Sequence, residues 1–480
     1  MTSRTERKIA PGPRGHFLLG HLPELRRDVL QLLMESVQQF GDVVRFRLGP
    51  LVIHLLSHPD HIKRVLQDNR HNYIRQTKGD ANIAAVVGQS LLTTNGEAWQ
   101  QRRHLIQPAF HHDQIASLVH VMTDATASML ERWRTEGQRG RALDIASEMM
   151  RPAYAIIGKS LFSADLRTDV DAVEKAMTVL LEETYHRLGT LLRIPEIIPT
   201  SRNRRYRWAI STLDQIVYGL IDARRQETDH APDLLSMLMQ ARDEETGEGM
   251  SDRELRDEMV TLLAAGHETT ANALTWMWYL LSKHPDVERR LHTELASVLG
   301  GRTPSLQDLA HLKYTTMVIK EAMRLYPPIW VMQRKVVSDD EIGNYYIPAG
   351  SEVTISPYVM HRHPAFWENP EVFDPDRFSD ERSVGRLRYA YLPFGGGPRL
   401  CVGHHFAMME AQLITAMVAQ AYHLDLVPGH PVEPKPWISL RPRQGLLMTL
   451  RQKASHQSLY THMPGDNAPG ARCPAFTVSA

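Results

Sequence analysis

One of the two cysteines in the chain lies in a segment that could hold a metal. Residues 394–403 read FGGGPRLCVG, and a helical pattern begins directly after Gly403. The three glycines allow a bend without side chains, so that backbone can pass close to a flat ligand. At a helix N-terminus Cys401 is favoured as the thiolate, which is the form that binds iron. An isolated cysteine in such a turn is more often a small buried residue, so its neighbours must decide between the two interpretations.

A second segment that could do chemistry reads AAGHETT at positions 264–270. It stands in the middle of a predicted helix over 257–283, which would be about 40 Å long and could cross the molecule. Ala265 and Gly266 have little bulk and leave room for a planar ligand and a diatomic molecule. A hydrogen bond from the Thr269 hydroxyl to the Ala265 carbonyl would loosen the helix locally and hold a water. Most threonines in helices form such a bond to the preceding turn without any further role.

The cysteine segment resembles the haem-binding loop of the cytochrome P450 family. The matching positions are Phe394, Gly397, Arg399, Cys401 and Gly403. The resemblance implies that Cys401 is the axial ligand of the iron of a haem b group, with Phe394 packed against its sulfur side. It also implies that Arg399 pairs with a haem propionate, and that Gly395 and Gly403 lie beside the cofactor.

The helix segment resembles the oxygen-activation motif of the same family. The resemblance implies that Ala265 and Gly266 line the haem site and that Thr269 orients the oxygen ligand and its water. Cleavage of the O–O bond needs protons, and a hydroxyl beside a carboxylate can relay them. Glu268 is therefore expected to supply protons and Thr269 to guide them.

Three charged residues are expected to lock the core on the haem side. Glu321 and Arg324 lie on one face of a predicted helix over 313–325 and can form a charge-assisted pair. The segment PDRF at 375–378 follows about fifty residues later. These features resemble the family's Glu-x-x-Arg helix and Pro-x-Arg-Phe segment, which implies a buried structural triad of Glu321, Arg324 and Arg377.

Further haem contacts are implied by weaker matches. Trp99 and Arg103 have the family's Trp-x-x-x-Arg spacing, and both side chains could reach a propionate. Arg334 matches another propionate partner with less specificity. His361 is either a further partner or an ordinary core or surface histidine.

Long amphipathic helical patterns position these residues, with strand patterns in two places. Val170–Leu188 and Arg204–Arg224 are predicted helices, 43–48 and 51–56 a predicted hairpin, and 342–348 and 352–355 predicted strands. The pattern indicates one mainly α domain with a small β portion. The resemblance spans 11–451 and implies a cytochrome P450-like fold, with haem between the long central helix and the helix after Cys401. Residues 452–480 are predicted to be a disordered tail, with Cys473 a free thiol.

Composition excludes several classes of protein. Lys plus Arg and Asp plus Glu both number 55, which argues against a nucleic-acid binder that relies on a global positive field. The most apolar run, Trp276–Leu281, is too short for a transmembrane segment of about 20 residues. Two cysteines give no disulfide framework and fit a cytoplasmic protein. No zinc site is expected, because the close histidine pairs, at 111–112, 361–363 and 404–405, have no second cluster.

The expected activity is that of a monooxygenase, which inserts one atom of O₂ into a C–H bond or a double bond. Ferredoxin or flavodoxin with its reductase would supply electrons to a monomeric enzyme. The candidate pocket stretches, at 75–87, before Pro199 and at 329–332, favour an apolar, medium-to-large substrate such as a fatty acid, terpenoid or macrolide. A haem-thiolate peroxygenase or peroxide isomerase, or a haem sensor, is the alternative. Neither explains an intact Glu268 and Thr269.

Overall fold

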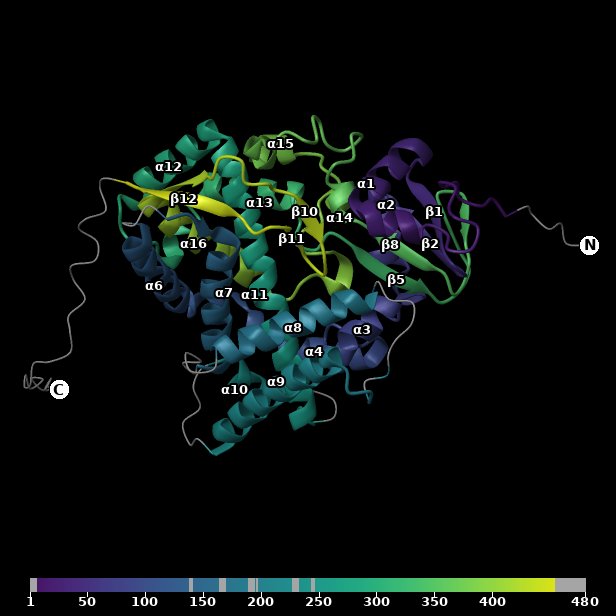
Figure 1. Cartoon of the computed structure of the whole chain (residues 1–480), viewed down its shortest axis with the longest axis horizontal. Coiled ribbons are helices and arrows are strands. Elements are labelled where there is room, and N and C mark those ends of the chain that lie inside the picture. The colour runs from purple at the N-terminus through teal and green to yellow at the C-terminus, as the bar shows by residue number, and fades with distance from the viewer. Residues whose placement is uncertain are drawn as a thin grey trace, which may run out of the picture.

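A long central helix and a five-stranded sheet organise the molecule. The computed structural model describes residues 7–137, 141–163, 170–188, 195, 197–226, 233–242 and 247–453. Of the expected tail only 452 and 453 are described, and Cys473 lies outside the described residues. Figure 1 shows a helical part, with α11 (Asp252–Lys283) at its centre, beside a part built on the sheet. The expected class, mainly α with a small β portion, is confirmed.

Helices make up most of the described chain. Val170–Leu188 and the helix over 313–325 form with the predicted bounds, whereas the prediction over 204–224 is too short at both ends. Within the described ranges, no helix combines the length and the apolar character that crossing a bilayer requires. Besides α11, the helices are α1 (Leu22–Phe40), α2 (Pro59–Lys63), α3 (Lys78–Val87), α4 (Gly96–Ile106), α5 (His112–Ala116), α6 (Val119–Gly137), α7 (Ile145–Phe162), α8 (Val170–Leu188), α9 (Ser201–Gln226), α10 (Leu234–Gln240), α12 (Pro285–Leu299), α13 (Lys313–Leu325), α14 (Pro357–Met360), α15 (Asp380–Ser383) and α16 (His404–Ala421).

Helix α11 begins five residues before the predicted start at 257. The Ser251 hydroxyl accepts from the Glu254 N–H, and the Glu254 carboxylate accepts from the Ser251 N–H at 2.9 Å, which makes a capping box. This box satisfies N–H groups that would otherwise lack partners at the helix start. The apolar periodicity begins later than the cap, so periodicity alone places the start too far along the chain.

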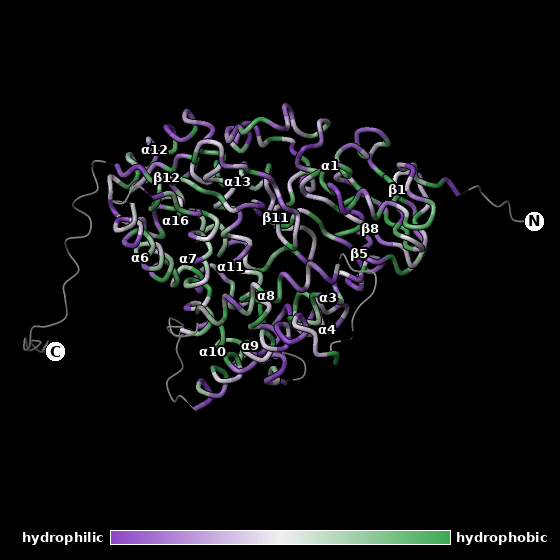
Figure 2. The backbone as a smooth tube through the Cα atoms, viewed as in Figure 1, coloured by the Kyte–Doolittle hydropathy of each residue, from purple (hydrophilic) through white to green (hydrophobic). Residues whose placement is uncertain are grey.

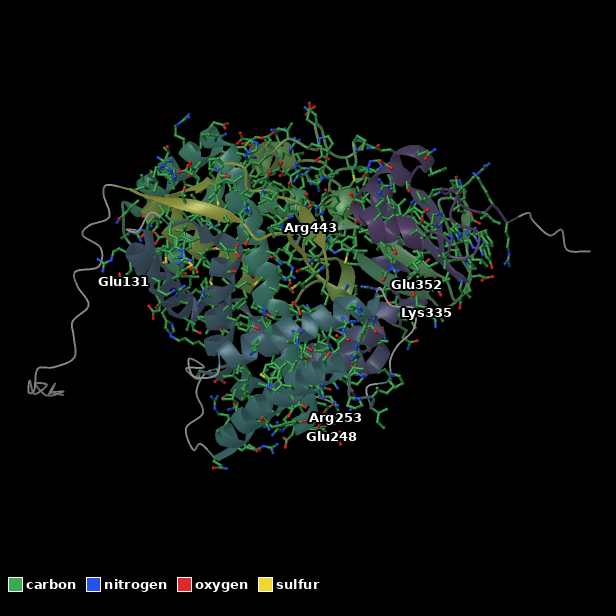
Figure 3. All side chains as sticks on the ribbon, viewed as in Figure 1. Glu131, Glu248, Arg253, Lys335, Glu352 and Arg443 are labelled. Carbon is green, nitrogen blue, oxygen red and sulfur yellow. The ribbon has the colours of Figure 1, made fainter. Side chains whose placement is uncertain are left out.

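The strands form several small sheets. They are β1 (Val43–Leu48), β2 (Leu51–Leu56), β3 (Tyr73–Ile74), β4 (Leu143–Asp144), β5 (Met332–Val336), β6 (Asp340–Ile342), β7 (Tyr345–Ile347), β8 (Glu352–Ile355), β9 (Tyr422–Leu426), β10 (Pro434–Pro436), β11 (Leu440–Pro442) and β12 (Leu447–Gln452). The largest sheet has the order β1-β2-β8-β5-β3, with β2 and β8 parallel. On its central strands Lys335 and Glu352 form a cross-strand pair (Figure 3).

The single strand predicted over 342–348 is wrong, because the chain turns back within it. Strands β6 and β7 pair antiparallel, and Gly343 and Asn344 between them both have positive φ, at 57° and 65°. A two-residue hairpin loop with two positive φ angles favours glycine and asparagine at these positions. The predicted hairpin of β1 and β2, by contrast, is confirmed, with Leu48 paired to Leu51.

One hydrophobic core joins α11 to the helices on either side of it. Buried residues of α6, α7, α11, α13 and α16 belong to this core. Figure 2 shows hydrophobic and hydrophilic residues alternating along the helices, as expected where each helix turns one face to a neighbour. Helices α11 and α16 therefore form a fixed frame, and the residues predicted to do chemistry lie on this frame.

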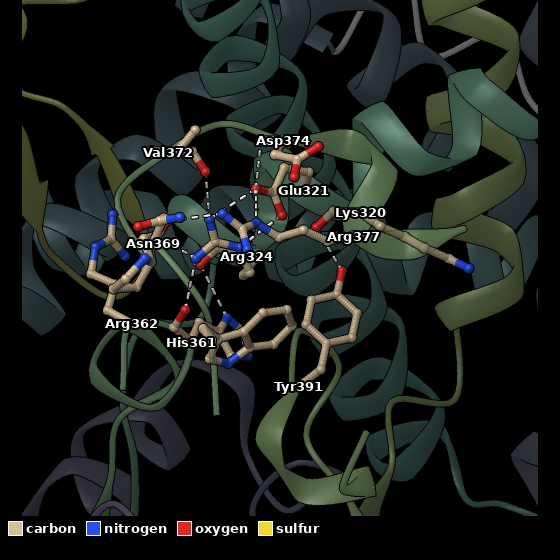
Figure 4. Close-up of polar contacts among 12 residues, drawn as sticks. Lys320, Glu321, Arg324, His361, Arg362, Asn369, Val372, Asp374, Arg377 and Tyr391 are labelled. Atoms are coloured by element: carbon tan, nitrogen blue, oxygen red, sulfur yellow. Dashed lines mark hydrogen bonds and ion pairs between the residues drawn. The ribbon is translucent and has the colours of Figure 1, made fainter. Parts of the chain in front are cut away.

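The predicted triad joins Glu321 and Arg324 of α13 to Arg377 of the segment 375–378. Glu321 and Arg324 are both fully buried, with Arg324 Nε 2.7 Å from Glu321 Oε2 (Figure 4). Arg377 Nε lies 3.3 Å from Glu321 Oε1. Arg324 also donates to the carbonyl oxygens of His361, Pro370 and Val372. The three side chains thus tie α13 to the irregular chain that leads to the cysteine loop.

Candidate active site

A cavity of about 1470 Å³ lies between α11 and the cysteine loop. Every residue that the sequence assigned to catalysis or cofactor binding lines it, whereas the triad residues do not. The lining includes Cys401, Phe394, Gly395, Arg399, Gly403, Trp99, Arg103, Arg334, Ala265, Gly266, Glu268 and Thr269. Segments far apart in the chain therefore meet at one site.

Cys401 stands on the wall of this cavity, at the start of α16. Protein surrounds the residue, but its surface is open to the cavity. Its backbone N–H donates to the Phe394 carbonyl at 3.0 Å, which closes the loop. Burial raises the pKa of the Cys401 thiol, and a hydrogen bond from the Gly403 backbone and the positive charge of Arg103 oppose this rise. The sulfur thus has one N–H donor from the loop and one nearby cation, Arg103, from α4.

The three glycines of the loop have different neighbours. Gly395 lines the cavity with a φ of 75°, so it fits the expected close approach of a flat ligand. A Cβ on Gly396 would lie 2.6 Å from the Tyr389 ring, and one on Gly397 would lie 2.1 Å from the Leu66 carbonyl oxygen. The second and third glycines therefore serve packing of the loop against protein, which the sequence did not indicate.

Helix α11 brings a hydroxyl and a carboxyl to the opposite wall. Thr269 Oγ1 donates to the Ala265 carbonyl at 2.8 Å, the bond that the sequence suggested. Glu268 is buried, and burial raises the pKa of its carboxyl while Ser439 and Arg441 act to lower it. The α11 wall can therefore hold a proton on Glu268 next to a hydroxyl that faces the cavity.

Gly266 lines the cavity and also lies against a neighbouring helix. Although it lines the cavity, a Cβ built on Gly266 would lie 2.8 Å from Cδ1 of Ile157 on α7. Ile157 is itself buried, so it has little room to move away. The missing side chain thus allows α11 and α7 to pack closely.

The structure provides a direct test of whether the cavity fits haem. Burial, together with the positive charges of Arg75 and Arg399, lowers the pKa of Arg334 to about 9. Burial and the charge of Arg75 lower the pKa of Arg399 to about 10. Arg75 is the third arginine of this group, and its carboxylate partner is Asp80 at 3.0 Å. The group therefore carries more positive than negative charge. The two propionates of a haem would supply the missing negative charge, so these residues fit the cofactor.

Helix α4 adds Arg103 and Trp99 to the arginine group that lines the cavity. Arg103 Nη1 donates to the Leu400 carbonyl at 3.1 Å, one residue before the cysteine, and the Arg399 guanidinium lies 4.6 Å from the centre of the Trp99 ring. The neighbouring Arg102 points elsewhere, to Glu254 and Glu258 of α11. The Trp-x-x-x-Arg spacing thus selects the arginine that faces the cysteine loop.

His361 is a core histidine and not a cavity residue. Its Nε2 accepts from the Leu392 N–H at 2.7 Å, which requires the proton on Nδ1, and Nδ1 lies 3.2 Å from the Arg324 carbonyl oxygen. Burial lowers the pKa of His361 to about 3, so the ring stays neutral. This ring links the triad to the chain two residues before Phe394.

Two of the predicted pocket stretches line the cavity. Residues of 75–87 and 329–332 contribute, whereas much of the stretch before Pro199 lies outside the described residues. The sequence missed the hairpin of β10 and β11, from which Trp437 and Ser439 reach the cavity, and it gave Asp80 no role. No local pattern marks these residues, because only the tertiary fold brings the hairpin beside Glu268.

Comparison with known proteins gives consistent matches over nearly the whole chain. The family model described as Cytochrome P450 matches residues 10–449. Cyclooctatin synthase from Streptomyces melanosporofaciens is 38% identical over 436 residues, which cover 90% of this chain and 93% of that protein. Cyclooctat-9-en-7-ol 5-monooxygenase from the same species is 38% identical and covers 86% and 88%. Pentalenene oxygenase from Streptomyces avermitilis is 32% identical and covers 87% and 91%.

A solved structure agrees with these matches. The crystal structure of the cytochrome P450DA heme domain superposes with a TM-score of 0.85 at 26% sequence identity. The match covers 94% of this chain and 99% of that one. The similarity therefore extends over both the helical part and the sheet.

Proposed function

Because the chain belongs to the cytochrome P450 family and is a monooxygenase, we propose that its substrate is a terpenoid, which it hydroxylates or epoxidises. The observation that carries this proposal is the lining of the cavity away from Cys401. It is made largely of aliphatic side chains, among them Ile83, Val86, Met177, Leu180, Leu262 and Val331. A ligand that binds against such a surface gains roughly 0.8 kcal/mol of binding free energy for each CH₂ group that it buries. Discrimination among apolar ligands then depends on how well their shapes fit the cavity.

The names of the relatives support the same class of substrate. Two of them act on cyclooctat-9-en-7-ol and pentalenene by their printed names. A rigid hydrocarbon skeleton loses little conformational entropy on binding, which suits an apolar cavity with few polar groups to orient a ligand. A fatty acid would gain from a cation in the cavity wall. Arg75 is already paired with Asp80, but Lys78 also lines the cavity, so fatty acids belong among the compounds tested.

The residues that line the cavity have separate roles in the proposed reaction. Bound haem b supplies the reductive activation of O₂. Cys401 would hold the iron through its thiolate, and Arg334, Arg399, Trp99 and Arg103, which line the same cavity, would bind the propionates. The buried Glu268 carboxyl would hold a proton, and the Thr269 hydroxyl, which lines the cavity, would help to deliver protons to bound oxygen. This acid–alcohol pair favours an O₂-dependent monooxygenase over a peroxygenase, a peroxide isomerase or a haem sensor.

The electron donor in this proposal is a ferredoxin or flavodoxin with its reductase, and the enzyme acts as a monomer in the cytoplasm. Support comes from the bacterial relatives and from Cys401, which must stay reduced to bind iron. Activity reconstituted with each donor in turn measures which one supports turnover.

Two spectroscopic measurements test the proposal. The reduced protein with carbon monoxide should show the red-shifted Soret band of thiolate ligation, and a histidine-type band would exclude Cys401 as the ligand. Cyclic terpene alcohols should then shift the haem spin state in a saturable titration. Fatty acids and macrolides of similar size serve as matched controls. A spin shift with either control class and none with terpenoids would refute the substrate assignment.

A further inference from the structure

A cluster of metal-ligand side chains lies outside the cavity, between α12 and a three-stranded sheet of order β4-β12-β9. We propose that Glu288, His292 and His423 bind a divalent transition-metal ion of the zinc type. Glu288 and His292 lie four residues apart on α12 and therefore on one face of the helix. His423 lies on β9, which follows α16 directly.

The distances between the ligand atoms fit a single ion. One oxygen or nitrogen from each residue lies within 4.8 Å of the others. His423 Nδ1 is 3.1 Å and His292 Nε2 is 3.5 Å from Glu288 Oε1. Zinc bonds of about 2.0–2.1 Å in tetrahedral geometry need ligand atoms roughly 3.3–3.4 Å apart. The cluster is therefore near the required spacing without movement of the backbone.

The chemistry of the ligands also fits. Two imidazoles and one carboxylate are a common zinc set, which leaves one position for water. Among the described residues, Nε2 of His292 is a buried atom with no hydrogen-bond partner. The three side chains are 13–26% exposed, so an ion can reach them from solvent. Glu288 Oε1, at 3.5 Å, is too far from this buried nitrogen for a good hydrogen bond, and an ion held by both atoms would satisfy it better.

Lys453 competes with an ion at this cluster. Its Nζ lies 2.8 Å from His292 Nδ1, and Lys453 directly follows β12 at the end of the described chain. An ion on Nε2 requires the ring proton on Nδ1, and an ammonium group cannot accept a hydrogen bond from it. Binding therefore displaces Lys453, and the ammonium charge opposes the ion. Removal of this lysine should tighten binding.

The test is titration of the haem-loaded full chain with ZnCl₂ by calorimetry after dialysis against a chelator. One saturable site should be lost in His423→Ala and in Glu288→Gln. It should be retained in His311→Ala, which removes an exposed histidine outside the cluster. The thiolate–carbon monoxide band confirms that each variant is folded. Zinc binding that is unchanged in both cluster variants would overturn the proposal.

A second variant tests the geometry without removing a ligand. Lys453→Met should bind zinc about tenfold more tightly, the ratio that corresponds to a loss of roughly 1.4 kcal/mol of opposing interaction. Unchanged or weaker affinity in Lys453→Met would mean that the ion does not use Nε2 of His292, and the site as described here would be wrong.

Discussion

Replacement of Glu321 by glutamine should strongly lower the free energy of unfolding, although it only replaces one carboxylate oxygen with an NH₂ group. The carboxylate accepts from Arg324 at 2.7 and 2.8 Å, from Arg377 at 3.3 Å and from the Asp374 N–H at 2.9 Å. Glutamine leaves both guanidinium groups buried without a counter-charge. Removal of one partner of a buried ion pair costs about 3–5 kcal/mol. That is roughly two to four orders of magnitude in the unfolding equilibrium.

The assay is urea unfolding of the haem-loaded protein, followed by circular dichroism and by the carbon monoxide band of the reduced protein. The free energy of unfolding comes from linear extrapolation. Asp376→Asn is the matched control, because Asp376 accepts from Arg290 at 2.7 and 2.8 Å in nearly the same geometry. That pair is about half exposed, at 54% and 39%, so its loss should cost less than about 1 kcal/mol.

The comparison isolates burial as the cause. If Glu321→Gln destabilises the protein no more than Asp376→Asn, the argument from buried charge is wrong. Arg377→Ala gives an independent check, because it removes the third member of the triad and its bonds to the carbonyls of Glu368 and Asn369. It should abolish folded, haem-loaded protein, and normal haem content would refute a structural role for Arg377.

Three further predictions concern the cavity and the buried histidines. Thr269→Ala should keep haem bound but release more hydrogen peroxide per NADPH consumed, and unchanged coupling would remove Thr269 from proton delivery. Arg399→Gln should weaken haem retention on challenge with apomyoglobin, because Arg334 and Arg399 share the excess positive charge, whereas retention equal to that of the unmodified protein would argue against propionate binding. Burial lowers the pKa of His54 from 6.5 to about 4, and neither of its ring nitrogens has a partner among the described residues. Because the folded pKa is the lower one, the unfolded chain binds the extra proton first, and stability falls as pH drops from about 6.5 towards 4. His54→Leu should therefore recover about 2 kcal/mol at about pH 5 relative to about pH 7.5 in urea unfolding, and no recovery would mean that His54 is protonated in the folded state.

The cavity residues could be predicted because each lies in a short motif with fixed spacing. Cys401 and Thr269 lie within a few residues of the backbone carbonyls that they contact, those of Phe394 and Ala265. Arg103 was found from the Trp-x-x-x-Arg spacing alone, because its partner, the Leu400 carbonyl, is distant in the sequence. Local periodicity likewise gave the bounds of α8 and α13. These features depend on local geometry, which the sequence records directly.

Long-range packing could not be predicted in the same way. The contact of Gly266 with Ile157 joins two helices more than a hundred residues apart, and the approach of Ser439 to Glu268 depends on where a short hairpin comes to lie. The strand prediction at 342–348 failed for a local reason, since the apolar and aromatic residues there outweighed the turn at Gly343 and Asn344. A hairpin signal was present in these two residues.

The close packing of Gly266 on Ile157 has a consequence for how this enzyme can vary. A methyl group at position 266 would lie 2.8 Å from Cδ1 of Ile157, so a larger residue at 266 requires the end of this buried side chain to move. The two positions are therefore coupled, and a smaller residue at 157 should relieve the cost of a larger one at 266. In directed evolution of the oxygen-activating helix, libraries that vary positions 157 and 266 together should yield more folded variants than libraries that vary position 266 alone.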